Sequence, residues 1–167
     1  TGDLAERKLL PALYYRQCDQ QFSEPTRIIG ASRSKMPDEE FRHFAEKAIR
    51  DHVPASDIKE EELRKFTQRI SYVAVDAKSG DGFEDLKQAI GDSASIRAFY
   101  LAVAPALFGE ISHKLKQHGL ITADSRIVVE KPIGRDLQSA RGLNDQIGAD
   151  FGEHQIFRID HYLGKET

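Results

Sequence analysis

The chain has 167 residues, of which 40% are hydrophobic and 31% are charged, and its formal net charge is -3. This length supports one domain with its own core, and the charge excludes the strongly basic surface typical of proteins that bind nucleic acid or membranes. Cys18 is the single cysteine, which excludes an intrachain disulfide and fits a cytoplasmic protein.

In the first half of the chain, hydrophobic periodicity predicts a helix over residues 3–17, whose inward residues recur at helical spacing (Ala5, Leu9, Ala12 and Leu13). A short strand follows over residues 26–31. A helix opened by Pro37 and Asp38 carries one apolar face (Phe41, Phe44, Ala45, Ala48 and Ile49). A further helix, capped by Asp57, turns three residues inward (Leu63, Phe66 and Ile70), and a strand follows over residues 71–75.

The second half continues the alternation with a short helix marked by Phe83, Leu86 and Ile90. The most apolar strand, residues 96–103, is expected to be central. Pro105 then begins a helix that ends at Gly119 and turns four residues inward (Leu107, Phe108, Ile111 and Leu115). A strand over 126–130, a helix over 137–147 and a strand over 154–158 complete the chain. The pattern predicts an α/β fold in one domain, with a mostly parallel sheet covered by helices on both faces.

Polar side chains gather directly after the last predicted strand. Asp160, His161, Tyr162 and Lys165 follow it within a few residues. In open α/β sheets, ligands bind at the carboxyl edge of the strands, so this cluster indicates a binding site. The alternative is a solvated helix start with Asp160 as its N-cap.

The turn after the second predicted strand reads Gly30-Ala31-Ser32-Arg33 and has no acidic residue. NAD enzymes usually place an acid at this position to bind the ribose 2′-hydroxyl, whereas an arginine suits the 2′-phosphate of NADP. The alternative is an arginine exposed in a loop.

Two further turns follow strands. Ala104-Pro105 is consistent with a plain helix start, and Lys131 is either a surface lysine or a mobile cation suited to hydroxyls and phosphates. The glycines at 80 and 82 lack the rest of a phosphate-binding loop and indicate an ordinary turn. The six histidines show no paired metal spacing, so no metal site is predicted.

These motifs, taken together, resemble those of glucose-6-phosphate dehydrogenases. The string Arg158-Ile159-Asp160-His161-Tyr162-Leu163-Gly164-Lys165-Glu166 resembles the family's signature, and Glu130-Lys131-Pro132-Ile133-Gly134 its Glu-Lys-Pro-Phe-Gly turn. The start of the chain, Gly2-Asp3-Leu4-Ala5 with Lys8 and Leu9, resembles the family's first helix. The resemblance runs the length of the chain.

The resemblance implies a Rossmann-like, doubly wound coenzyme domain whose first strand is missing from the chain. It implies oxidation of glucose 6-phosphate to 6-phosphoglucono-lactone with hydride transfer to NADP+, the first step of the oxidative pentose phosphate pathway. The family's general base, a histidine, and its subunit interface belong to a C-terminal domain, so the parent enzyme is expected to be a homodimer or homotetramer.

The resemblance also assigns site residues. Asp160 would orient the general base, and five residues would bind the substrate (Lys8, Lys131, His161, Tyr162 and Lys165). Nine residues would bind the cofactor (Gly2, Asp3, Leu4, Lys8, Ser32, Arg33, Ala104, Pro105 and Lys131). Pro132 would lie at a hinge, preceded by a cis peptide bond.

Two alternatives to a glucose-6-phosphate dehydrogenase remain, one of a different functional class and one with a different substrate. One is a non-catalytic NADP-binding domain that acts as a sensor or partner surface, and the other is an NADP-dependent oxidoreductase of another sugar. Neither needs the cluster from residue 158 to residue 166, and its presence favours the glucose-6-phosphate enzyme.

Overall fold

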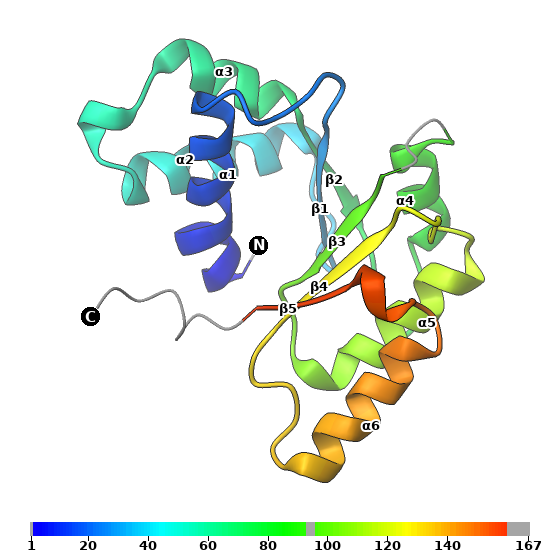
Figure 1. Ribbon diagram of the computed structural model, residues 1–167. Coiled ribbons are helices and arrows are strands. Elements are labelled where there is room, and N and C mark those ends of the chain that lie inside the picture. Colours follow the sequence, from blue (N-terminus) through cyan, green and yellow to red (C-terminus); the bar gives the residue numbers. More distant parts are fainter. Residues whose placement is uncertain (1, 93–95, 160–167) are drawn as a thin grey trace. The chain divides into compact units, whose positions relative to one another are not determined.

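The computed structural model describes residues 2–92 and 96–159, and the chain forms two compact units, Thr1–Val75 and Asp76–Thr167. Each unit is described by itself (Figure 1). The expectation of a single domain stays a prediction.

The first unit begins with the helix predicted over residues 3–17. It has a π-helical turn, Ala5–Leu9, that continues directly as α1, Leu10–Cys18. The predicted inward face is only partly correct: Leu13 packs against the core, but Ala12 is exposed and α1 buries Leu10, Tyr14 and Gln17 instead. A π-helical turn holds an extra residue per turn, so it shifts the phase of the residues that follow.

The remaining elements of the first unit are β1 (Ile28–Ser32), α2 (Asp38–His52), a 3-10 turn (Ala55–Asp57), α3 (Glu60–Gln68) and β2 (Ile70–Ala74). The three α-helices pack against one another, and α2 also packs on β2 (Figure 1). Their shared core includes Tyr14, Ile49 and Phe66, which are fully buried.

The capping role predicted for Asp57 is wrong. α3 begins at Glu60, and its N-cap residue, Lys59, makes no side-chain capping bond. Asp57 instead lies in the preceding 3-10 turn, where its carboxylate accepts a hydrogen bond of 3.1 Å from the hydroxyl of Tyr15. The carboxylate of Asp57 therefore makes a tertiary contact with α1 in place of the predicted capping bond to α3.

The second unit contains three α-helices and three strands within its described residues. The helices are α4 (Phe83–Ile90), α5 (Phe108–Gln117) and α6 (Leu137–Gly148), and the strands are β3 (Ala98–Leu101), β4 (Arg126–Glu130) and β5 (Ile156–Ile159). A 3-10 turn, Pro105–Leu107, leads into α5, and another, Glu153–Gln155, leads into β5. Gly119, with φ of +65°, ends α5 as predicted.

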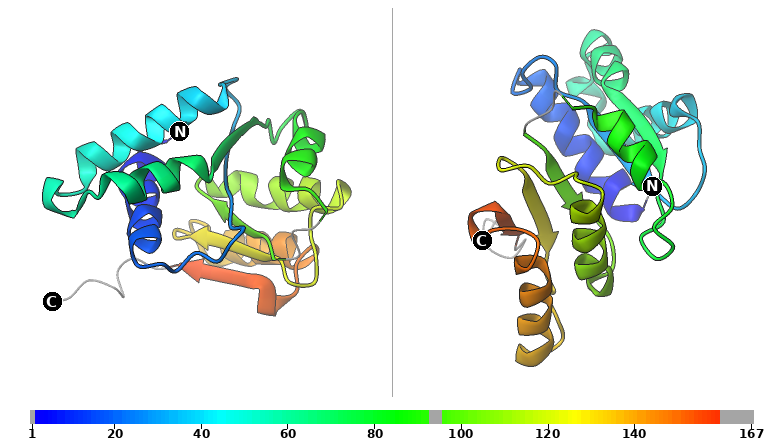
Figure 2. Two further views of the ribbon diagram at one scale, coloured as in Figure 1. Left: turned by 90° about the horizontal axis from the view of Figure 1, so that it is seen from above. Right: turned by 90° about the vertical axis from the view of Figure 1, so that its right-hand side faces the viewer.

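The sheet of the second unit has the order β3-β4-β5, with all pairs parallel. The strand predicted over 96–103 is shorter, and within this sheet β4 lies in the middle rather than β3. Pairing begins at Ala98 opposite Arg126, and Ile96 before it is 66% exposed. Buried Ile127 and Val129 of β4 contribute to the core, and α5 and α6 lie side by side (Figure 2).

Parallel strands joined through helices give an α/β, Rossmann-like fold, as the sequence predicted. Carboxyl ends of neighbouring strands share an edge in each sheet. Ser32 lies opposite Ala74 in the first unit, and Glu130 lies opposite Ile159 in the second. None of the helices in the described residues is long and apolar enough to cross a membrane.

Candidate functional site

The first group of predicted site residues lies at the start of the first helix. The carbonyl oxygen of Gly2 accepts the N–H of Glu6 at 3.0 Å, so Asp3 and Leu4 lie in the opening turn. Backbone N–H groups at such a helix start point toward bound anions. Lys8 is exposed one turn further on, and Asp3 is paired with Arg7 at 2.7 Å.

The second group lies in the turn after β1. Arg33 and Lys35 are exposed there, and Arg33 forms no ion pair with any other residue that the structure describes. The nearest acid along the chain, Asp38, is engaged by the backbone N–H of Tyr72 at 2.7 Å. The turn therefore offers cations rather than a carboxylate, which suits a phosphate group better than a ribose 2′-hydroxyl.

Ser32, also predicted to bind the cofactor, is held by a residue that sequence reasoning missed. Its Oγ lies 2.6 Å from the hydroxyl oxygen of Tyr72 on β2. In the sequence Tyr72 is one aromatic residue in a strand, and no spacing rule links it to a turn 40 residues earlier. The parallel pairing of Gly30 with Tyr72 is the feature that brings them together.

The third group lies in the second unit. Ala104 precedes the turn that Pro105 opens, and exposed Lys131 follows β4 directly. The N–H of Lys131 donates to the carbonyl oxygen of Ile159 at 3.1 Å. The turn carrying Lys131 is thus bonded to the end of β5, directly before Asp160.

The peptide bond between Lys131 and Pro132 is cis, which confirms the prediction. A second cis bond, between Glu24 and Pro25, was not anticipated.

Asp160, His161, Tyr162 and Lys165 lie outside the described residues, so their predicted roles stay predictions. The site residues that are described divide between the two units. Gly2, Asp3, Leu4, Lys8, Ser32 and Arg33 belong to the first unit, and Ala104, Pro105 and Lys131 belong to the second.

Neither a phosphate-binding loop at Gly80 and Gly82 nor a metal site is found in the residues that the structure describes. Gly80 and Gly82 both have φ of +84° in the turn before α4, as expected of an ordinary glycine turn. Among the residues that the structure describes, no group of three His, Cys, Asp or Glu side chains could hold a metal ion.

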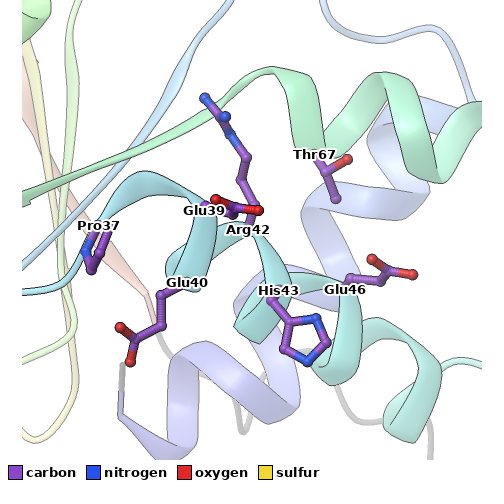
Figure 3. A pocket seen from close by; sticks show the side chains of 7 residues that line it. All are labelled: Pro37, Glu39, Glu40, Arg42, His43, Glu46 and Thr67. Atoms are coloured by element: carbon purple, nitrogen blue, oxygen red, sulfur yellow. The ribbon is translucent and has the colours of Figure 1, made fainter.

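A shallow surface hollow lies over α2 in the first unit (Figure 3). Its lining includes three carboxylates, those of Glu39, Glu40 and Glu46, with His43 between them. It contains none of the predicted site residues, and its negative charge disfavours a phosphate-bearing ligand. We therefore assign the hollow no part in the site.

Parallel strands that end in a cationic turn, together with a helix whose N-terminus suits an anion, are features of Rossmann-like dinucleotide-binding domains. The whole chain, residues 1–167, matches the family model described as "Glucose-6-phosphate dehydrogenase, NAD binding domain". The chain therefore belongs to the glucose-6-phosphate dehydrogenase family, and this match indicates a nicotinamide coenzyme.

Individual relatives agree with the family match. Glucose-6-phosphate 1-dehydrogenase of Rhizobium meliloti is 61% identical over 100% of this chain and 34% of its own length. Glucose-6-phosphate 1-dehydrogenase 5, cytoplasmic, of Arabidopsis thaliana is 42% identical over 99% of this chain and 35% of its own length.

A solved structure described as "Glucose-6-phosphate dehydrogenase in complex with its substrate glucose-6-phosphate" superposes with a TM-score of 0.86 at 35% identity. The superposition includes 99% of the present chain and 35% of the chain in that solved structure. The chain thus spans about a third of the length of the relatives it matches.

Proposed function

We propose that this chain is the coenzyme-binding part of a glucose-6-phosphate 1-dehydrogenase that oxidises the C1 hydroxyl of glucose 6-phosphate. The 61% identity with the Rhizobium meliloti enzyme across the whole chain carries the proposal. The enzyme names shared by the relatives support this function over a non-catalytic NADP-binding sensor and over another sugar oxidoreductase.

We propose NADP+ rather than NAD+ as the coenzyme. Exposed Arg33 would bind the 2′-phosphate, with Ser32 beside it, and the helix start at Gly2, Asp3 and Leu4 would face the pyrophosphate. Bound NADP+ supplies the acceptor for the hydride removed from C1. Ala104 and Pro105 would lie beside the nicotinamide.

Substrate binding is assigned chiefly to the turn after β4 and to the residues that follow β5 in the sequence. His161, Tyr162 and Lys165 would bind the phosphate dianion through donor and cationic groups, and Lys131 would contact both substrate and coenzyme. Lys8 would add a further cation. Asp160 would hold the general-base histidine in the correct tautomer and orientation, as the aspartate of a catalytic triad does.

Two further proposals concern the setting of the enzyme. A relative named as cytoplasmic in Arabidopsis thaliana supports a cytoplasmic location. We also propose that the working enzyme is a homodimer or homotetramer, as the family resemblance in the sequence implies.

The test uses the natural polypeptide that contains these residues, with any flanking sequence kept. NADPH formation from glucose 6-phosphate and NADP+, followed by absorbance, tests the reaction. Arg33→Ala should weaken NADP+ binding about 10–100-fold and NAD+ binding little, since one charge-assisted hydrogen bond contributes about 1.5–3 kcal/mol.

Arg64→Ala removes another exposed arginine of the same unit, on α3, and serves as the matched control. Equal losses for NADP+ and NAD+ in the Arg33 variant would remove that residue from the 2′-phosphate site. An enzyme that does not turn over glucose 6-phosphate would overturn the proposed reaction.

A further inference from the structure

We propose that Tyr72 is a positioning residue for the 2′-phosphate end of the coenzyme and thereby helps to set the preference for NADP+. It acts by holding the turn after β1 and by passing a hydrogen bond to Ser32. This inference rests on the proposed function, since it requires that the turn receives a 2′-phosphate.

Tyr72 binds the turn at both of its ends. Its hydroxyl oxygen lies 2.5 Å from the carbonyl oxygen of Ser34 and 2.6 Å from Oγ of Ser32. Its backbone N–H donates to Oδ1 of Asp38, the first residue of α2, at 2.7 Å. Residues 33–37, which connect β1 to α2 and include the predicted phosphate ligand, are therefore bracketed by contacts to one residue.

The ring of Tyr72 is fixed in place by its neighbours. Only 8% of the residue is exposed, and its ring centroid lies 5.1 Å from that of Phe41 on α2. Phe41 is itself stacked on Phe44 at 5.9 Å. A hydroxyl on so enclosed a ring has little freedom, so it defines where the turn lies.

A count of protons shows how Tyr72 can assist Ser32. The phenol has one proton, and donating it to the carbonyl of Ser34 leaves the hydroxyl of Ser32 to donate to the phenol oxygen. When a phosphate oxygen accepts from Ser32 instead, the phenol proton turns from the carbonyl of Ser34 to Oγ of Ser32, and the backbone N–H of Tyr72 still holds the turn at Asp38. The two hydroxyls then donate in series, which strengthens the terminal donor.

The consequence is specific to one coenzyme. NADP+ and NAD+ differ only in the 2′-phosphate, so a residue that acts through this turn should affect NADP+ alone. A residue that merely stabilises the fold should affect both coenzymes equally.

The first experiment measures the dissociation constants of NADP+ and NAD+ by titration calorimetry for the natural polypeptide and its Tyr72→Phe variant. We expect Tyr72→Phe to weaken NADP+ about tenfold, within the range for one hydrogen bond to a charged group, and NAD+ less than twofold. The variant keeps the ring and its packing, so only the hydroxyl is lost.

Tyr14→Phe is the matched control. Tyr14 is fully buried in the same unit, and its hydroxyl accepts the N–H of Lys59 at 2.8 Å, away from the turn. Burial raises the pKa of Tyr14 to about 12, so this control removes a neutral phenol. Tyr14→Phe should lower the melting temperature without changing the ratio of the two dissociation constants.

A second experiment tests whether Tyr72 acts through Ser32. If it does, Ser32→Ala combined with Tyr72→Phe should weaken NADP+ binding by less than the product of the two single effects. A double variant whose loss of NADP+ affinity equals the product of the two single losses would overturn the inference. Equal losses of NADP+ and NAD+ affinity in Tyr72→Phe would also overturn it, and either result would leave the proposed NADP+ enzyme intact. A natural polypeptide without preference for NADP+ would overturn both.

Discussion

Gly30 lies on β1 beside the ring of Phe41 on α2. A Cβ atom added at Gly30 would lie 2.3 Å from Cζ and 2.4 Å from Cε1 of that ring. Carbon atoms in contact are normally about 3.5–4.0 Å apart, so Gly30→Ala requires the ring to move by more than about 1 Å. Phe41 is 4% exposed and has Tyr72 and Phe44 beside it, so the movement spreads to them.

The magnitude follows from two opposing terms. Overpacking a dense core typically costs about 1–3 kcal/mol. Replacing glycine by alanine also restricts the unfolded chain, which stabilises the fold by about 0.4–1 kcal/mol. The net expectation for Gly30→Ala is a loss of about 1–2 kcal/mol, which corresponds to a fall in Tm of about 2–8 °C for a cooperative unit of 150–250 residues.

Circular dichroism melts of the natural polypeptide and two variants provide the assay. Gly142→Ala is the control, because a Cβ there meets no atom within 4 Å and the residue lies inside α6. The same substitution should raise stability by about 0.5–1 kcal/mol there. A Gly30→Ala protein that melts at or above the unmodified protein would show that the Phe41 ring has room to move, which would refute the steric argument.

Three other predictions concern the site and one helix start. His161→Asn should chiefly raise KM for glucose 6-phosphate, because a phosphate ligand contributes mostly uniform binding, whereas Asp160→Asn should lower kcat; steady-state NADPH formation separates the two. A polypeptide limited to residues 1–167 should show no measurable turnover, because a missing general base alone costs about 10²–10⁴-fold; robust NADPH formation by it would show that the base was misplaced. The backbone N–H of Ser139 lowers the pKa of Asp136, the N-cap of α6, so the charge-dependent part of the cap's contribution is present above the ordinary carboxyl pKa and is lost as pH falls through the lowered pKa. Asp136→Ala should therefore lower Tm more at neutral pH than in acid, where the protonated carboxyl still accepts a weaker hydrogen bond, and Asp136→Asn, which keeps an uncharged cap, should lower Tm less than Asp136→Ala does.

The sequence predicted the kinds of elements and much of the core, because apolar spacing depends on local geometry. Phe83, Leu86 and Ile90 mark α4 and are all buried, and β4 has the predicted bounds, Arg126–Glu130. The errors occur where tertiary contacts override local preference. β3 is limited to the four residues that pair with β4, from Ala98 to Leu101, and the hydroxyl of Tyr15 donates to the carboxylate of Asp57 that was expected to cap a helix.

The candidate site was less accessible to prediction than the fold. Arg33 and Lys131 were candidates because each directly follows a strand, where α/β sheets bind ligands, and the family resemblance gave them their predicted roles. Tyr72 could not, since its role depends on the exact register of β1 against β2 and on a hydroxyl that reaches the neighbouring turn. Register and side-chain reach are properties of the packed molecule rather than of residue spacing.

The parallel pairing of β1 with β2 has a consequence for synthesis on the ribosome. Ile28 pairs with Ile70, so β1 leaves the ribosome about 40 residues before its partner. At roughly 5–20 residues per second, the strand waits about 2–8 s with its hydrogen-bonding edge unpaired. During that interval the nascent chain exposes an aggregation-prone segment, and the helices α2 and α3, made in between, are the elements available to shield it.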